Sequence, residues 1–377
     1  MVRLGILTIY GGSNYGNKLQ NYALQFFLKE MGYSVETIRY SISFDKHVKG
    51  KLSKIKLLRR KYFSDGFAES VYNLRRIIDK HIHNKEISAK SANRTRAISQ
   101  FEEKNISLSD KFYNTAESLL PTKGQYDYII IGSDQVWNPY WQGSRDEFFL
   151  SFLEKNQRIA YAPSIGVSSI PDQERDRYKA LLSGFNHLSC REKTGAETIR
   201  NLTGLECEHV VDPVFLLDSD KWDQVCKTAE KPNHKFILTY FLAGMRRSTM
   251  KVIDSFAREN GLEIVDAFSH DSCKSKFASV EEFINLIKNA EIVFTDSFHG
   301  TAFSIIFKRQ FVVCDRRFQA KSERMNSRID DLLERLGIRN RNIESNWKTN
   351  LINYTVISEI LAPWIQHSKD YLMKQIR

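Results

Sequence analysis

Short apolar runs alternate with longer amphipathic stretches along most of the chain, and this alternation constrains the fold more than any other feature. The runs end at turn-forming residues, which is typical of buried strands in a parallel sheet. We expect strands at Leu4–Tyr10, Val35–Tyr40, Tyr128–Ile131, Ile159–Pro163, His187–Cys190, His209–Val211, Lys235–Phe241, Leu262–Asp266, Ile292–Thr295 and Phe311–Cys314. Helical spacing predicts helices at Asn17–Met31, Pro171–Leu182, Thr194–Asn201, Ser248–Asn260, Val280–Asn289, Thr301–Phe307 and Ser327–Leu336.

The alternation occurs once in each half of the chain, which indicates two α/β domains in tandem. Right-handed crossovers produce parallel sheets covered by helices on both faces. We therefore predict two Rossmann-like domains, at residues 1–220 and 231–377, joined within the polar stretch Asp218–His234. Residues from about 41 to 123 are rich in helix formers and are expected to form a helical insertion in the first domain. Because ligands of such sheets bind beyond the carboxyl ends of the strands, the site is expected in the cleft between the domains.

Positive charge is concentrated in this insertion. The whole chain has a net charge of +11, and the segment 46–104 alone carries 16 Lys and Arg against 6 Asp and Glu. Its first part combines basic residues with an apolar stripe at helical spacing, formed by Val48, Leu52, Ile55, Leu58 and Tyr62. Such a helix can lie on an anionic membrane or bind a phosphorylated partner. The alternative is a helix that packs its stripe on its own domain and leaves a solvated basic face.

The cysteine pattern and the apolar runs indicate the compartment. The five cysteines (Cys190, Cys207, Cys226, Cys273 and Cys314) include no C-x-x-C pair, so neither a disulfide framework nor a zinc site is expected. Leu4–Tyr10 is too short for a secretory signal core, and no run of about 18 apolar residues is present. We expect a cytoplasmic protein, with peripheral contact to the inner face of the membrane through the basic segment 46–104 as a further expectation.

Two motifs in the first domain place polar residues directly after a predicted strand. The first is G-G-S-N-Y-G-N, residues 11–17, where glycines let the backbone approach a ligand and a helix begins. Its Asn14 and Asn17 are candidates to bind sugar hydroxyls, with helix capping as the alternative. The second is I-I-I-G-S-D-Q-V-W-N-P, residues 129–139. Its candidate ligand contacts are Ser133, Asp134, Gln135, Trp137 and Asn138.

For two of these residues a structural role is the alternative. Asp134 is also a candidate helix cap. Trp137 is either a platform for a sugar ring or a core residue.

Two further motifs supply candidate anion ligands. In L-S-C-R-E-K-T-G, Arg191 directly follows a strand, where a guanidinium can hold a carboxylate or phosphate through two hydrogen bonds; a salt bridge to Glu192 or a surface position is the alternative. In V-F-T-D-S-F-H-G-T, His299 lies at a strand-to-helix turn with Asp296, Ser297 and Gly300. Histidine can move a proton near neutral pH, and helix N-termini stabilise anions. Farther along the chain, basic residues that could complete an anion pocket are Arg316, Arg317 and Arg328.

Other site classes receive little support. No H-x-x-x-H or H-E-x-x-H motif is present, and the single D-x-D, at Asp218, is better explained as a helix cap. The chain has neither a Walker A loop nor an RNA-binding aromatic motif, so no nucleic-acid partner is expected. We expect no metal ion and no cofactor.

Taken together in their order, the motifs resemble those of the polysaccharide pyruvyl transferase family. Six matching motifs extend over most of the chain, namely G-G-S-N-Y-G-N, G-S-D-Q-V-W-N-P, Y-A-P-S-I-G, S-C-R-E, V-D-P-V-F-L-L with the later Trp222, and D-S-F-H-G-T. The resemblance implies two Rossmann-like domains facing across a cleft, as in the glycosyltransferase B fold. It implies transfer of a pyruvyl group from phosphoenolpyruvate to a pair of sugar hydroxyls, which forms a cyclic ketal and releases phosphate.

The resemblance also implies roles for individual residues. His299 matches the family's donor-site histidine, and Arg191 matches its donor-site arginine. Arg328 takes the place of a basic residue that is lysine in many members, so the chain departs from the pattern in residue type and in spacing. Asp134 or Asp296 would take protons from the attacking hydroxyls. The implied acceptor is a sugar of a capsule or exopolysaccharide, either in the polymer or in its lipid-linked precursor.

Two alternatives remain at this stage. A nucleotide-sugar glycosyltransferase of the same fold would bind a uridine or guanosine diphosphate sugar and would not respond to phosphoenolpyruvate. A non-catalytic protein that docks on nucleic acid or lipid through its basic segment would lose affinity steeply with salt. The motifs in the cleft favour an enzyme.

Overall fold

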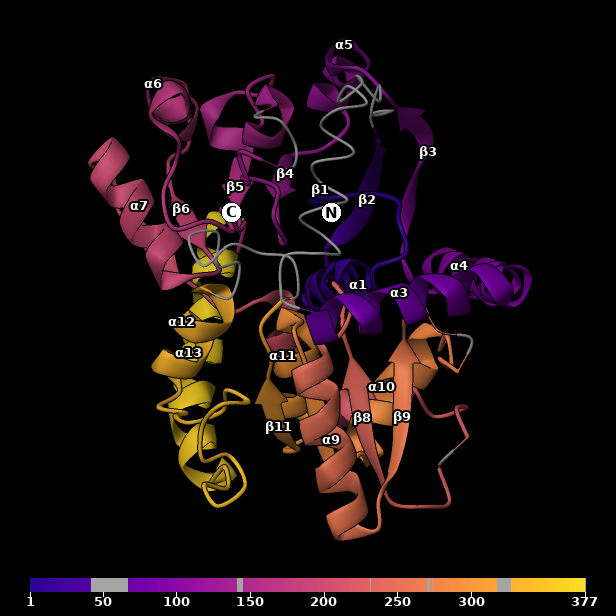
Figure 1. Ribbon diagram of the computed structural model, residues 1–377. Helices are drawn as coiled ribbons and strands as arrows, with labels where there is room; N and C mark the ends of the chain where they lie inside the picture. Colours follow the sequence, from indigo (N-terminus) through magenta and orange to yellow (C-terminus); the bar gives the residue numbers. More distant parts are fainter. Residues whose placement is uncertain are drawn as a thin grey trace.

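The fold is known from a computed structural model, which describes residues 1–41, 67–140, 145–230, 232–269, 272, 274–316 and 327–376. It contains two parallel sheets, one in each half of the chain, with the sheet of the first half above that of the second half in Figure 1. The helix expected between Val48 and Tyr62 and the candidate anion ligand Arg317 lie outside the described residues.

The N-terminal sheet has the strand order β3-β2-β1-β4-β5, with β1 at its centre. Its strands are β1 (Arg3–Leu7), β2 (Ser34–Tyr40), β3 (Leu108–Tyr113), β4 (Tyr128–Ile131) and β5 (Arg158–Ala160). All pairings are parallel, and Leu4 is in register with Val35 on one side and Tyr128 on the other. A separate parallel pair, β6 (Leu188–Cys190) and β7 (Cys207–His209), lies next to β5. This strand order is that of a Rossmann domain.

The C-terminal sheet has the order β11-β10-β8-β9, again with parallel pairing. Its strands are β8 (Phe236–Tyr240), β9 (Glu263–Phe268), β10 (Ile292–Thr295) and β11 (Gln310–Val313). Helices of the two domains are α1 (Tyr15–Glu30), α5 (Ala116–Leu119), α6 (Arg175–Leu182), α7 (Lys193–Thr203), α8 (Ser219–Val225), α9 (Arg247–Asn260), α10 (Val280–Asn289), α11 (Phe298–Ile306) and α12 (Ser327–Arg335). Two such domains facing each other form the arrangement of the glycosyltransferase B fold, as predicted.

Helix α10 shows how local sequence fixes an element. Ser279 caps its first turn, and Glu282 completes the capping box by accepting from the backbone N–H of Ser279. Val280, Phe283 and Ile287 then recur on one face and are fully buried. Burial of each large apolar side chain stabilises the fold by about 1.5–3 kcal/mol. Packing of this face therefore contributes more than intrinsic helix propensity to holding α10 against the sheet.

The two domains share a hydrophobic core across their interface. Tyr15 of α1 stacks on Phe283 of α10 with ring centroids 4.4 Å apart. Trp222 of α8 is fully buried, packs edge-on against Phe303 of α11, and donates its indole N–H to the carbonyl of Val214. Because these contacts join the domains through apolar side chains, the loops that face the cleft are held at a fixed separation.

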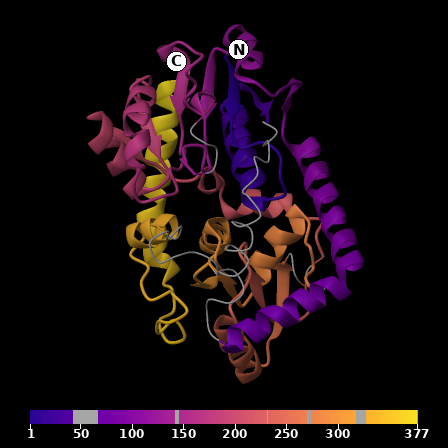
Figure 2. The ribbon, with the colours of Figure 1, turned by 45° about the horizontal axis from the view of Figure 1, so that its top comes forward.

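Two long helical segments also bridge the domains, one on each side of the molecule (Figure 2). The insertion between β2 and β3 forms α3 (Phe67–Ile82) and α4 (Asn84–Asn105). The helix α13 (Tyr354–Gln375) follows the C-terminal sheet yet returns to the N-terminal one. There, Trp364 donates to the carbonyl of His209, and Tyr371 donates to the carbonyl of Ala160.

The observed elements agree closely with the expected ones where strands are buried. The bounds of β4, β10 and α10 are those predicted. The elements that were not predicted include α13, the helix α8 within the expected polar join, and the edge strand β3, which lies within the stretch for which only helix was expected. Asp218 caps α8 by accepting from Lys221 N–H, as the helix-cap interpretation requires. Among the described helices, none is long and apolar enough to cross a membrane.

Candidate functional site

The site lies where loops at the carboxyl ends of both sheets meet. Arg191 directly follows β6 in the N-terminal domain, and His299 lies in the first turn of α11, directly after β10 of the C-terminal domain. Both side chains are almost completely buried. The prediction that Arg191 and His299 lie after strand ends is confirmed. The fold brings the two side chains together from opposite domains.

Asp212 joins Arg191 and His299. It lies at the start of the short 3-10 helix η5 (Pro213–Leu216). Its Oδ2 atom is 2.7 Å from Arg191 Nη1, 3.2 Å from Ser133 Oγ and 3.6 Å from His299 Nε2. The first two contacts are hydrogen bonds, and the third is an ion-pair distance. Burial raises the pKa of Asp212, but His299 and Arg191 outweigh burial and hold it well below its usual range.

Arg328 of α12 brings a second guanidinium into this region. Its side chain is buried, and no acidic side chain forms a salt bridge with it within the described part of the chain. Burial, together with the positive charges of Arg191 and Arg316, lowers its pKa to about 9. Like charges brought together in a buried place are unfavourable by themselves, so this arrangement is stabilised when an anion binds.

Several side-chain nitrogen atoms of Arg191, Arg328 and His299 have no hydrogen-bond partner among the described residues. They are Nε and Nη2 of Arg191, Nε of Arg328 and Nε2 of His299. Nη2 of Arg191 is 3.7 Å from Asp134 Oδ1, which is too long for a hydrogen bond. A buried donor without a partner costs about 1–3 kcal/mol. The site thus presents unused donors from both domains to a ligand with several acceptor oxygens.

The glycine-rich loop before α1 contacts the histidine directly. A Cβ atom added to Gly16 would lie 1.9 Å from His299 Nδ1, so the imidazole ring occupies the space of a missing side chain. Phe298 directly precedes His299 in the chain. The centroid of its ring lies 4.4 Å from the guanidinium carbon of Arg191. Gly16 is therefore required for close packing against His299. The sequence alone did not indicate this requirement.

A comparison with protein families identifies the chain. A model of the polysaccharide pyruvyl transferase family matches residues 14–317, which include the last part of the glycine-rich motif from Asn14 onward, Arg191, Asp212 and His299. The chain belongs to the polysaccharide pyruvyl transferase family. Arg328 lies beyond the matched residues. No curated protein matches the chain.

Three of the solved structures to which the chain is similar match it at low sequence identity. A putative UDP-N-acetylglucosamine 2-epimerase from Listeria monocytogenes is 9% identical, with 98% of each chain covered and a TM-score of 0.46. UDP-N-acetylglucosamine 2-epimerase from Neisseria meningitidis is 9% identical, with 100% of this chain and 94% of the other covered and a TM-score of 0.45. An uncharacterised protein from Klebsiella pneumoniae is 14% identical, with 64% and 82% covered and a TM-score of 0.34.

The loop after β4 lies beside Asp212 but turns most of its polar residues inward. Ser133 is fully buried, where its Oγ donates to the carbonyl of Ala162 at 2.9 Å or to Asp212, and its N–H donates to Gln20 Oε1. Asp134 has a positive φ of 69° and is the more exposed of the two carboxylates beside Arg191, with 12% of its side chain accessible against none for Asp212. Asp134 therefore faces the site, whereas Ser133 supports Asp212.

Three expected acceptor contacts occupy other places. Trp137 is a core residue: it stacks on Phe149, donates its indole N–H to the carbonyl of Phe148 and is 1% exposed, so it offers no ring face to a sugar. Asn138 donates to Gln135 Oε1 at 2.8 Å, and both side chains are buried. Of the two roles that the sequence left open for Trp137, the structure shows the core residue, because the ring packs between Phe149 and Phe185.

The remaining expected residues mostly support the loops. Asn14 caps α1 by accepting from Gly16 N–H, the structural alternative that the sequence left open. Asn17 is buried, and its Nδ2 atom has no partner among the described residues. Asp296 is fully buried and accepts from the N–H groups of Leu242 and Ala243. Burial raises the pKa of Asp296, although Arg316 and the backbone donors oppose this effect.

At the start of α11, two small residues allow the close turn that presents His299. Ser297 caps the helix by accepting from Gly300 N–H at 3.4 Å. A Cβ atom on Gly300 would lie 2.6 Å from Thr295 Oγ1, so only glycine fits between the helix and the end of β10. Both residues therefore position His299 through the backbone.

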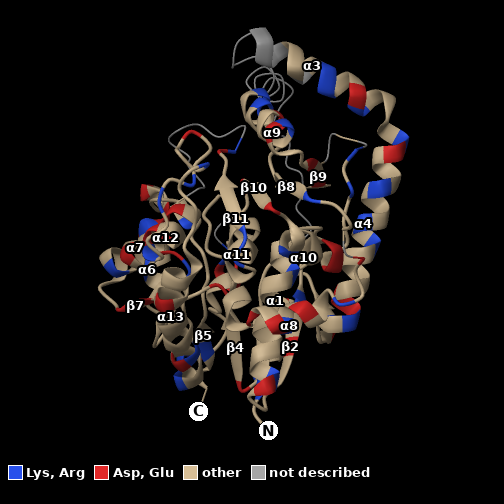
Figure 3. Ribbon diagram, turned by 90° about the horizontal axis from the view of Figure 1, so that it is seen from below, with Lys and Arg blue, Asp and Glu red and all other residues tan. Residues whose placement is uncertain are grey.

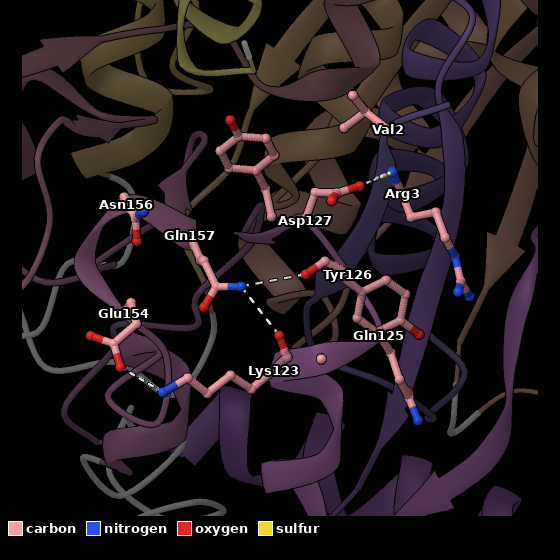
Figure 4. Close-up of a pocket in the computed structure, with 11 residues that line it drawn as sticks. Val2, Arg3, Lys123, Gln125, Tyr126, Asp127, Glu154, Asn156 and Gln157 are labelled. Atoms are coloured by element: carbon pink, nitrogen blue, oxygen red, sulfur yellow. Dashed lines mark hydrogen bonds and ion pairs between the residues drawn. The ribbon is translucent and has the colours of Figure 1, made fainter.

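Within the described ranges, no three His, Cys, Asp or Glu side chains gather as metal ligands do. A cavity of about 680 Å³ lies at the amino ends of β1 and β4, opposite to the cleft (Figure 4). Its polar groups are already paired, as Lys123 with Glu154 and Asp127 with the Arg3 N–H show. The cations of the cleft remain the candidate site.

Asp212 is the one central residue that sequence reasoning did not select. The sequence contained a signal for it, because Asp212 directly follows the expected strand His209–Val211 in the motif V-D-P. A carboxylate at a strand end next to a conformationally restricted proline is placed by the backbone alone.

Proposed function

We propose that this pyruvyl transferase moves the pyruvyl group of phosphoenolpyruvate onto two hydroxyls of a sugar, forming a cyclic ketal and releasing phosphate. The proposal rests on one observation. Arg191, Arg328 and His299 are all buried, and each has at least one donor nitrogen without a hydrogen-bond partner among the described residues. Phosphoenolpyruvate has a carboxylate and a phosphate on adjacent positions. Two guanidiniums supply paired donors for such oxygens, and they do so in a place that excludes most water.

The reaction balances with the groups that the site contains. Carbon 2 of the donor gains two bonds to acceptor oxygens, while its bond to the phosphate oxygen and the second bond of its double bond to carbon 3 break. The two acceptor hydroxyls release two protons, of which one ends on carbon 3, converting the methylene to methyl, and the other on phosphate. His299 is the proposed acid for protonation of carbon 3 or of the departing phosphate. Arg191 and Arg328 stabilise the negative charge of the donor as it passes to phosphate.

Asp134 is the proposed general base. Among the carboxylates next to Arg191 it has the greatest exposure, whereas Asp212 has none of its surface free. Asp296 is the weaker choice because two backbone N–H groups already occupy its oxygens. The proposed role of Asp212 is to hold Arg191 and His299 in place.

Release of inorganic phosphate from phosphoenolpyruvate, measured with a panel of nitrophenyl hexosides as acceptors, tests the proposal. Arg191→Ala and His299→Gln should each lower acceptor-dependent release by at least about 100-fold. Arg175→Ala and His187→Gln change exposed residues and serve as matched controls.

Binding of a UDP-hexose without any response to phosphoenolpyruvate would favour the glycosyltransferase alternative. Normal phosphate release by Arg191→Ala would contradict the assigned site.

We further propose that the acceptor is reached at a membrane surface and that α3 makes the contact. Leu74, Ile78 and Ile82 recur at helical spacing and are each at least half exposed. Basic residues lie among them, as Figure 3 shows for α3 and α4. An exposed apolar stripe with basic neighbours matches an anionic lipid surface.

Flotation with vesicles tests this second proposal. Phosphatidylcholine vesicles with 30% phosphatidylserine should bind the chain, and pure phosphatidylcholine vesicles should bind it less. Replacing Leu74 and Ile78 with Gln should reduce binding without changing phosphate release from water-soluble acceptors. Equal binding of wild type and variant to both vesicles would exclude a role for α3.

A further inference from the structure

Arg94 of the insertion helix α4 is buried between the two domains. Its exposed fraction is 3%, although arginine is among the residues least often buried. Its guanidinium lies 4.3 Å from the ring centre of Tyr15 in the N-terminal domain and 3.8 Å from that of Phe268 in β9. A cation enclosed by one aromatic ring from each domain fixes α4 to both of them.

The same guanidinium holds the glycine-rich loop by hydrogen bonds. Nε donates to the hydroxyl oxygen of Tyr15 at 2.8 Å, and Nη2 donates to the carbonyl of Ser13. The Tyr15 hydroxyl in turn donates to the carbonyl of Ala278 in the C-terminal domain. Burial raises the pKa of Tyr15 to about 12, so its hydroxyl stays protonated and can serve as donor and acceptor together.

A second contact holds the other end of the loop. Lys18, in the first turn of α1, forms a buried ion pair with Glu102 of α4. The end of the glycine-rich motif and the first turn of α1, from Ser13 to Lys18, are thus attached to α4 on both sides of Gly16. Since Gly16 lies against the imidazole of His299, any displacement of this loop changes the space available to that ring.

We infer that Arg94 is a positioning residue: through Ser13 and Tyr15 it presses Gly16 against His299 and so sets the orientation of the imidazole. The inference rests on the proposed function only in giving His299 a role in transfer. Its structural part concerns the ring's placement and stands apart from any activity. The helical insertion then contributes to catalysis without touching the substrate.

The experiment compares Arg94→Gln with Arg96→Gln, an exposed arginine two residues along the same helix. The first readout is the ¹³Cε1–¹H NMR signal of His299, assigned by its loss in His299→Gln. Arg94→Gln should shift or broaden this signal, and Arg96→Gln should leave it unchanged. The second readout is turnover, which should fall by about 10–100-fold in Arg94→Gln, because a displacement of about 1 Å at a reacting group has effects of this size.

Affinity for phosphoenolpyruvate separates positioning from collapse of the site. It should fall by less than turnover does in Arg94→Gln, because the two arginines of the donor site would still hold the donor while His299, which adjoins Gly16, is displaced. Arg94→Lys keeps the charge but has no planar fork for Ser13 and Tyr15 together, so it should remain defective. If Arg94→Gln does not fold, Tyr15→Phe removes the shared hydroxyl while keeping the ring contacts, and it should shift the His299 signal in the same way.

Two results overturn the inference. One is a His299 signal in both Arg94→Gln and Tyr15→Phe that matches wild type. The other is recovery of full turnover in Arg94→Lys, which would make charge the only requirement. If neither the wild type nor any variant releases phosphate, the proposed function is wrong. The NMR comparison still tests the positioning of His299 in that case.

Discussion

Replacement of Arg328 with methionine should make the ligand-free protein more stable while abolishing donor binding. The guanidinium is buried, and its pKa of about 9 lies about 3.5 pH units below the usual 12.5. At 1.36 kcal/mol per unit, this interval corresponds to an unfavourable free energy of about 5 kcal/mol for keeping the charge there. Replacing buried charges with apolar side chains of similar size stabilises proteins by about 1–4 kcal/mol in practice, so we expect a gain within this range.

Thermal unfolding with and without phosphoenolpyruvate measures both effects. Unfolding entropy of about 2.1 cal/mol/K per residue gives roughly 1 °C per kcal/mol for 377 residues, so Arg328→Met should melt about 1–5 °C higher than wild type. At a donor concentration of about 100 Kd, wild type should gain about 2.7 kcal/mol, or about 3 °C, and the variant should gain nothing. Arg339→Met, which changes an exposed arginine, is the matched control. A variant that melts lower than wild type, or that keeps the shift with donor, would refute the reasoning.

Three more changes test the site. Gly16→Ala places a Cβ atom 1.9 Å from His299 Nδ1, so turnover should fall at least tenfold, and equal turnover would show that the ring moves aside freely. Asp212→Asn leaves the buried charge of Arg191 without its partner and should lower stability by about 3–5 kcal/mol at neutral pH, measured by denaturant titration. Because the folded-state pKa of Asp212 is depressed, its stabilisation is present above about pH 4 and is lost as pH falls below that; the variant should therefore show less loss in acid, and an unchanged acid profile would contradict this. Phosphate release should be unaffected by excess EDTA, and a loss that added magnesium restores would require a metal-dependent mechanism.

The elements that the sequence predicted best are those whose residues are buried on all sides. Ile292–Thr295 is an uninterrupted apolar run, and its bounds are reproduced to the residue. Leu108–Tyr113 was missed because it is an edge strand that carries Asp110 and Lys111 at exposed positions, which hides the apolar signal. The helix α13 contains Pro363 in its interior, a residue that usually ends a helix.

For the site, the sequence located strand ends but not the direction in which loops turn from them. Arg191 and His299 were found because each follows a buried strand within a few residues. Trp137 follows a strand as well, yet its loop folds into the core, and only tertiary packing decides between these outcomes. The contact of Gly16 with His299 joins residues 283 positions apart, a distance over which a single sequence contains no local signal.

The return of α13 to the N-terminal sheet sets the order in which the chain can fold during synthesis. Every residue of the proposed donor site is made before Tyr354, but the surface around β5 and β7 stays uncovered until α13 has left the ribosome. The first domain therefore cannot reach its final packing while it is the only domain made. Completion of both domains is tied to a single late event, the docking of this helix.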